Sequence, residues 1–277
     1  EQRMREAGLS AERLRAAARE DTHRWSTVRQ ADGMRGFLAR AENARQKMEA
    51  LFAALEQLPT EGWPGPEPLL EIRENPRLLR SALAELQSVR RKIRRLPFAA
   101  AVHEVEPRTV AVACGYLTAS NGVWNADALR IYLAELQRSE PLLLAELWVL
   151  PVMLRFTLLE EVLQDAEERL EALRWSAGAP AFDGAPGDLA FGARITTHLL
   201  ALREIAYVDW YFVMEPLVVF DAILREDPAE AYAAMDFDSR EVYRKQVARI
   251  ARYTVCSETE VAREAIKLAR EAQLQPV

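Results

Sequence analysis

Residues 141–174, PLLLAELWVLPVMLRFTLLEEVLQDAEERLEALR, decide the fold class of this chain. The first half of the stretch is apolar on all sides, which predicts a helix that is buried all round. Glu146, Pro151 and Arg155 interrupt it, so it predicts a core helix rather than a membrane span, which needs about 20 uninterrupted apolar residues. Pro151 should also kink the helix, because proline has no amide to donate. The second half narrows to a single apolar stripe and should emerge at the surface, with Leu159, Leu163, Ala166, Leu170 and Leu173 on that stripe.

Two charged residues and a tryptophan stand out within this apolar helix. Glu146 and Arg155 are nine residues apart, so they point to opposite faces and cannot pair with each other. Because a buried charge needs a partner, we expect each to pair with a group on another helix. Together with Trp148 they are candidates for ligand binding or for docking of another domain.

A second periodic pattern lies near the N-terminus. Apolar residues recur at alternating steps of three and four through Met34, Phe37, Ala41, Ala44, Met48, Leu51, Leu55 and Leu58. This seam over about four heptads predicts a helix that packs along a partner. Residues 11–28 carry a similar stripe that Asp21 interrupts, so we expect a long N-terminal helical hairpin that turns near residues 31–33.

The remaining segments complete an all-α prediction, a multi-helix bundle that ends in short capped helices. Asn125, Asp227, Asp238 and Ser257 are the expected helix caps, and Ser257 with Glu260 forms a capping box. Residues 98–108 look irregular, and no stretch alternates well enough to predict a strand. We expect one elongated helical domain over residues 1–277, with a sub-boundary at 59–68 and a mobile loop at 176–190.

Composition excludes several classes of protein. The chain has 36 Lys and Arg against 42 Asp and Glu, a net charge of −6, which does not favour a nucleic-acid partner. The two cysteines, Cys114 and Cys256, have no metal-ligand spacing. The chain begins Glu1-Gln2-Arg3 without a signal peptide, so we expect a segment of a longer polypeptide.

Complete catalytic motifs are missing, and two weaker patterns remain. Asp236-Phe237-Asp238 has the form of a divalent-metal motif, but it lies between expected helices, where Asp238 already serves as a cap. Five of the six residues at 90–95 are basic. They are favoured at a helix C-terminus, and an anionic partner such as a lipid surface or another domain stays open as an alternative.

Two stretches resemble a known family. Residues 140–155 read EPLLLAELWVLPVMLR, and residues 227–244 read DPAEAYAAMDFDSREVYR, followed by Ser257-Glu258. In order and separation both are similar to the N-terminal helical region of cyclic β-1,2-glucan synthases, and the resemblance spans roughly residues 68–273. Departures from the family pattern fall at Leu143-Leu144-Ala145 and at Glu160-Glu161.

The resemblance implies that the chain belongs to a larger enzyme, and it assigns no active site to the chain itself. Such proteins are large inner-membrane enzymes that polymerise glucose from UDP-glucose, with a divalent metal expected at the transferase site, and that cyclise the product. Their catalytic motifs lie downstream of the matched region, so no catalytic residue, cofactor or metal site maps onto this chain. We expect its partners to be other domains of the same polypeptide, at the cytoplasmic face of a bacterial inner membrane, with the oligomeric state open.

Three hypotheses therefore compete. In the first, the chain is a non-catalytic helical domain that supports or docks the catalytic domains of a glucan synthase. In the second, it is a helical protein-interaction scaffold, and in the third an enzyme that acts on a saccharide through Asp236, Asp238 or Glu146. Under the first, the docking candidates are Glu146, Trp148, Arg155, Asp236, Arg240 and Arg244.

Overall fold

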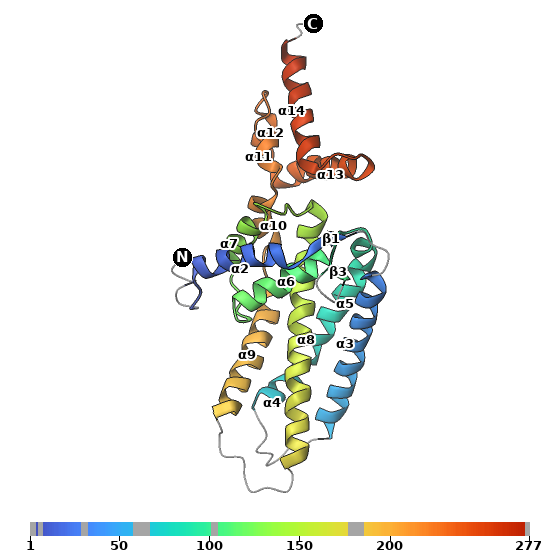
Figure 1. Ribbon diagram of the computed structural model, residues 1–277, viewed down its shortest axis with the longest axis vertical. Helices are drawn as coiled ribbons and strands as arrows, with labels where there is room; N and C mark the ends of the chain where they lie inside the picture. The colour runs from blue at the N-terminus through green and yellow to red at the C-terminus, as the bar shows by residue number, and fades with distance from the viewer. Residues whose placement is uncertain are drawn as a thin grey trace.

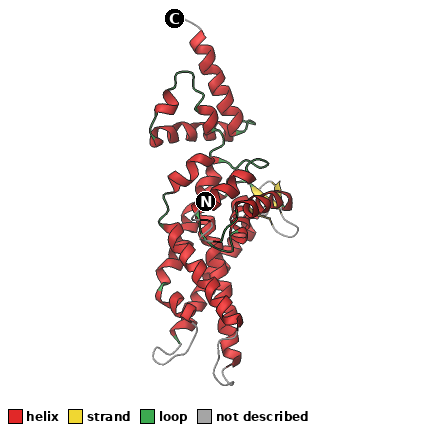
Figure 2. Ribbon diagram, turned by 90° about the vertical axis from the view of Figure 1, so that its left-hand side faces the viewer, coloured by secondary structure: helices red, strands yellow, loops and turns green. Residues whose placement is uncertain are grey.

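The computed structural model describes residues 4, 8–28, 33–57, 67–100, 105–176 and 186–274. It is mostly helical, as the sequence predicts, and it contains one small sheet (Figures 1 and 2). In chain order the elements are α2 (Ala11–Arg24), β1 (Ser26–Val28), α3 (Gly33–Glu56), α4 (Glu67–Glu74), α5 (Pro76–Ile93), β2 (Phe98–Ala100), β3 (Val105–Pro107), α6 (Arg108–Ala119), α7 (Ala126–Leu136), α8 (Leu144–Ser176), α9 (Pro186–Ala206), α10 (Trp210–Met214), η1 (Glu215–Leu217), α11 (Asp221–Leu224), α12 (Ala231–Ala234), α13 (Phe237–Tyr253) and α14 (Glu258–Leu274).

Helix α8 is the axis of the molecule. Figure 1 shows it running along the helical body, with α9 on one side and α5 and α3 on the other. Helix α6 packs across its first half. Its apolar residues are buried on several faces, which confirms the prediction of a core helix, and they include Leu147, Leu150, Met153, Phe156, Leu159 and Val162. Pro151 lies inside this helix.

The seam of α3 is buried within the chain. Phe37, Ala44, Met48, Leu51 and Leu55 are all buried, and α3 packs against α8, α5 and α4. Phe37 contacts Phe156 of α8 edge to face, with ring centroids 5.8 Å apart. The seam therefore finds its partners among the chain's own helices.

The predicted N-terminal hairpin is wrong. Helix α2 crosses the body and packs on α7 and α6 rather than along α3 (Figure 1). The reason lies in Asp21, which the sequence pattern treats as an interruption of an apolar stripe. Its buried carboxylate instead accepts a hydrogen bond from the Tyr132 hydroxyl of α7 at 2.7 Å, which fixes α2 on that helix.

Residues 98–108 are more ordered than the sequence predicts. Strands β1, β2 and β3 form an antiparallel sheet in that order, with Ser26 opposite Ala100 and Phe98 opposite Pro107. Each strand has three residues, which is too short for an alternating pattern to be visible in sequence. The sheet lies at the side of the helical body (Figure 2).

The C-terminal helices form a group at one end of the body, where α14 packs on α13 and α11 (Figures 1 and 2). The Ser257 capping box is confirmed, since Ser257 N donates to Glu260 Oε2 at 2.7 Å and Glu260 N donates to Ser257 Oγ at 3.2 Å. The cap of α13 is Asp236, which accepts from Ser239 N at 2.7 Å, so the prediction that Asp238 caps this helix is wrong. Asp238 lies in the first turn, where an acid is also favoured.

Two predicted loops fall largely outside the described residues. Residues 58–66 and 177–185 are not described, which covers most of the expected boundary at 59–68 and most of the expected loop at 176–190. Residues 186–190, which we expected in that loop, begin α9. Among the described residues, no helix combines the length and the apolar character that crossing a membrane requires.

Candidate functional site

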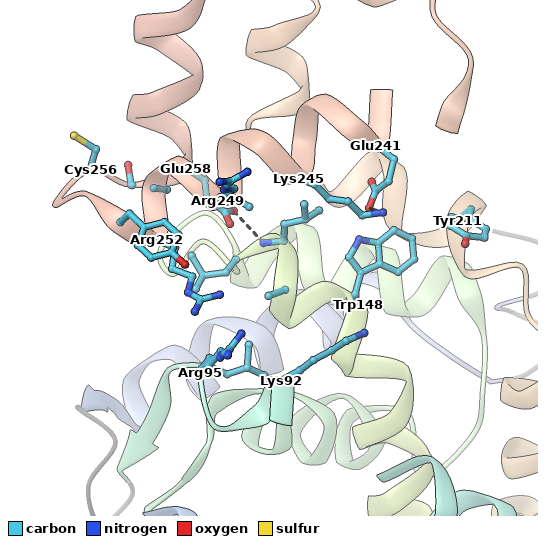
Figure 3. Close-up of a pocket in the computed structure, with 18 residues that line it drawn as sticks. Lys92, Arg95, Trp148, Tyr211, Glu241, Lys245, Arg249, Arg252, Cys256 and Glu258 are labelled. Atoms are coloured by element: carbon cyan, nitrogen blue, oxygen red, sulfur yellow. Dashed lines mark hydrogen bonds and ion pairs between the residues drawn. The ribbon is translucent and has the colours of Figure 1, made fainter. Parts of the chain in front are cut away.

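A cavity of about 750 Å³ lies where the C-terminal helices meet the body. Its lower wall comes from the end of α5 and the start of α8, and its upper wall comes from α13 and the start of α14 (Figure 3). The N-terminal part of α8, which carries much of the family resemblance, therefore contributes directly to this cavity.

Basic side chains line both walls. Lys92 and Arg95 come from the end of α5, and Lys245, Arg249 and Arg252 come from α13. In Figure 3 the side chains of Arg95 and Arg252 extend into the cavity from opposite walls. The five basic residues at 90–95 thus divide into two sets, because Lys92 and Arg95 line the cavity whereas Arg90, Arg91 and Arg94 do not.

Aromatic rings form one side of the cavity. Trp148 packs against Tyr211 with ring centroids 5.2 Å apart, and Tyr211 packs against Phe237 at 4.7 Å. Buried Trp148 Nε1 and Glu241 Oε2 face each other, and neither makes a hydrogen bond of normal geometry (Figure 3). Of the six docking candidates predicted from the sequence, Trp148 is the one that lines the cavity.

Two carboxylates in the lining have raised pKa values. Burial raises the pKa of Glu258 to about 7; the amide of Leu144, which donates to Glu258 Oε2 at 3.0 Å, opposes that rise, and the nearby Glu146 adds to it. Burial also raises the pKa of Glu241, against the smaller opposing effects of Lys245 and Arg244. Near pH 7 the Glu258 carboxyl is therefore only partly ionised.

Glu146 lies beneath this cavity in a buried ion pair. Its Oε1 accepts from Arg108 Nε at 2.9 Å, and its Oε2 accepts from Arg108 Nη2 at 2.5 Å and from the amide of Leu143 at 2.9 Å. Arg108 begins α6, and both side chains are almost fully buried. The pair joins α6 to the first turn of α8, which confirms the prediction that Glu146 pairs with another helix.

Arg155 has an equivalent role on another face of α8. It is buried, pairs with Glu85 of α5 and donates to Ser81 Oγ at 2.7 Å. The prediction that it pairs with another helix is confirmed. Glu146 and Arg155 each anchor α8 to a different neighbour.

Asp236, Arg240 and Arg244 are brought together at a corner formed by α13, η1 and α11. Arg240 and Arg244 both donate to Glu215 Oε1 at 2.7 Å. Arg244 is fully buried and also lies 2.7 Å from Asp221, whose carboxylate accepts from the Tyr232 hydroxyl at 2.6 Å. Burial opposes the charge of Asp221, but hydrogen bonds from Tyr232, Arg225 and Arg244 outweigh it, so the pKa of Asp221 lies below its usual value.

Sequence reasoning missed the partners in these networks. Arg108, Glu215 and Asp221 are single charged residues in short amphipathic segments, and no motif marks them. Glu258 directly follows the Ser257 cap in sequence, and nothing there indicates that its carboxylate reaches back to the amide of Leu144 at the start of α8. The described ranges contain no group of three or more His, Cys, Asp and Glu residues arranged to hold a metal ion.

A double-mutant cycle on Arg108 and Glu146 tests the buried pair. Arg108→Met leaves the buried carboxylate of Glu146 without a cation and should lower the free energy of unfolding by about 3–5 kcal/mol. Glu146→Leu should cost less, because Arg108 keeps its ion pair with Glu140 at 3.1 Å. The double variant should lose far less than the sum, because two apolar side chains can replace a buried pair. Urea unfolding measures all three, and additive losses would contradict the account.

The pKa of Glu258 predicts a pH-dependent stability. The folded state retains a proton that the unfolded state releases above its usual pKa of about 4.5, so stability should fall as pH rises from about 5 to 8. Glu258→Gln removes this loss and should raise stability at pH 8, by up to roughly 3 kcal/mol, and change it little at pH 5. Thermal unfolding across this range checks the effect, with Glu56→Gln as an exposed control. An equal gain at both pH values would rule out titration of Glu258.

Comparison with known proteins gives one informative match. The cyclic beta-(1,2)-glucan synthase NdvB of Rhizobium meliloti is 26% identical over 272 residues, which covers 73% of this chain. The chain spans about 10% of the length of that relative. No family model matches the chain. The chain is therefore similar to a region of a cyclic β-1,2-glucan synthase, as the segments at residues 140–155 and 227–244 predict.

Proposed function

We propose that the chain is a non-catalytic helical region of a larger glycosyltransferase of the cyclic β-1,2-glucan synthase type. It supports or docks the catalytic domains, and the parent polypeptide uses UDP-glucose as donor, with any metal held elsewhere in that polypeptide. Its partners are those domains, and its place is the cytoplasmic face of a bacterial inner membrane. The similarity to a tenth of a glucan synthase supports this setting.

One observation carries the non-catalytic part of the proposal. Within the segments that resemble the synthases, the buried charged residues serve contacts inside the chain. Glu146 pairs with Arg108, Arg155 with Glu85, and Arg244 with Glu215 and Asp221. Asp236 caps α13 with the carboxylate that a metal or substrate would need. These side chains position helices, which is what a supporting region requires.

A docking surface is available on α13. Val242, Ile250 and Tyr253 lie on one face of this helix and are exposed by 58%, 49% and 74%. The opposite face carries the buried residues Arg244 and Val247. Docking of a catalytic domain on the exposed face would bury this apolar surface.

A transfer assay tests the proposal. The purified chain should transfer no glucose from radiolabelled UDP-glucose, whereas transfer by the chain alone would overturn the proposal.

In the parent polypeptide, Asp236→Ala should lower stability by about 1 kcal/mol through the lost cap, with glucose transfer per folded molecule unchanged. Asp238→Ala is the matched control, because Asp238 is exposed and is not the cap. Transfer lost only in the folded Asp236 variant would assign that carboxylate to the chemistry.

The alternative is a protein-interaction scaffold, favoured by the same exposed face of α13. The seam of α3 no longer supports it, because the chain's own helices bury that seam. Under our proposal the isolated chain should sediment as a monomer, and Ile250→Asp should leave its mass unchanged. A dimer that Ile250→Asp dissociates, with Val219→Asp as the exposed control, would favour the scaffold.

A further inference from the structure

The cavity between α13 and the start of α8 concentrates positive charge in a chain that is negative overall. Its lining contains five basic residues and two acids, Glu241 and Glu258, whereas the whole chain carries −6. Among the described residues, Lys245 lies 3.6 Å from a carboxylate, that of Glu241. In that part of the chain no ion pair joins the other four cations of the lining to a carboxylate. Cations that face each other across a cavity repel, so this arrangement favours an anion between them.

The helix dipole accounts for only part of this charge. Lys92 and Arg95 lie at the C-terminal end of α5, and Arg252 lies in the last turn of α13, where cations are favoured. Lys245 and Arg249 lie further inside α13, beyond the reach of that effect. Lys245 and Arg249 therefore add positive charge to the cavity that the C-terminal ends of α5 and α13 do not explain.

The other walls of the cavity are apolar and aromatic. Leu96, Leu143 and Leu144 contribute aliphatic surface, and Trp148 and Tyr253 contribute rings. An inorganic anion alone would leave this surface in contact with water. A ligand that places a charged group among the arginines and an apolar or aromatic group against Trp148 would use both parts.

We propose that this cavity binds a phosphate-bearing ligand that also carries an apolar or aromatic group. Arginine offers planar pairs of donors that match phosphate oxygens, and two arginines from opposite walls can hold one phosphate group from both sides. The volume of about 750 Å³ lies within the range of about 300–1,000 Å³ typical of small-molecule sites. A soluble phosphate compound and the headgroup of an acidic lipid share this chemistry.

The proposal adds a ligand site to the supporting role and requires no glucose transfer. It holds whether or not the parent polypeptide is a glucan synthase. A negative transfer assay therefore says nothing against it, and a failed binding assay says nothing against the supporting role.

The test measures binding of two probes to the purified chain at about 150 mM salt, where long-range charge effects are screened. Inorganic pyrophosphate is titrated by calorimetry, and vesicles of phosphatidylglycerol are tested by co-sedimentation, with phosphatidylcholine vesicles as the neutral control. Arg95→Gln/Arg252→Gln removes one cation from each wall. Arg90→Gln/Arg91→Gln removes two cations of the same cluster that do not line the cavity. Circular dichroism checks that each variant folds. If the Arg95→Gln/Arg252→Gln variant does not fold, Lys92→Gln/Arg249→Gln takes its place.

The expected result is that the cavity variant binds at least one probe about tenfold or more weakly than the unmodified chain, with the control variant unchanged. Binding of pyrophosphate assigns the site to a soluble phosphate compound. Binding of phosphatidylglycerol vesicles without pyrophosphate, with the same dependence on Arg95 and Arg252, assigns it to a lipid headgroup. Binding of neither probe, or an equal loss in both variants, would overturn the proposal.

Discussion

The burial of α8 is the constraint on which the rest of the structure depends. This helix lies among α3, α5, α6 and α9, and its apolar residues are shielded on several faces. Two charges lie within the buried stretch, and each requires a partner at a fixed place on a neighbouring helix. Arg108 supplies one and Glu85 the other, so the register of α6 and α5 against α8 is set by charge pairing as well as by packing.

The same logic extends to the C-terminal helices. Glu258 at the start of α14 accepts from the amide of Leu144, which links that helix to the first turn of α8. Arg244 joins α13 to η1 and α11 through Glu215 and Asp221. These contacts place α13 opposite the end of α5, and the basic cavity lies between them. The cavity thus lies at a junction between helices, and several separate stretches of sequence contribute to its walls.

Local patterns in the sequence predict the helices well, and they predict their partners poorly. Asn125 and Ser257 identify helix starts because a cap acts within three residues of itself. The sequence predicts that Glu146 and Arg155 each have a partner of opposite charge, because burial of a charge demands one. It does not identify those partners, Arg108 and Glu85. The hairpin prediction failed because two similar stripes do not specify that they meet, and the hydrogen bond from Tyr132 to Asp21 spans 111 residues. The cavity was beyond prediction for the same reason, since Lys92 and Arg252 become neighbours only after folding.

Native-state hydrogen exchange of the α8 amides tests the central place of this helix most directly. If α8 is the frame of the fold, the amides of residues 149–163 should exchange only through global unfolding, with the highest protection in the chain. The amide of Arg155 should behave like its apolar neighbours, because its charge is neutralised in place. Exchange of these amides through a local opening well below the global free energy of unfolding would contradict the account.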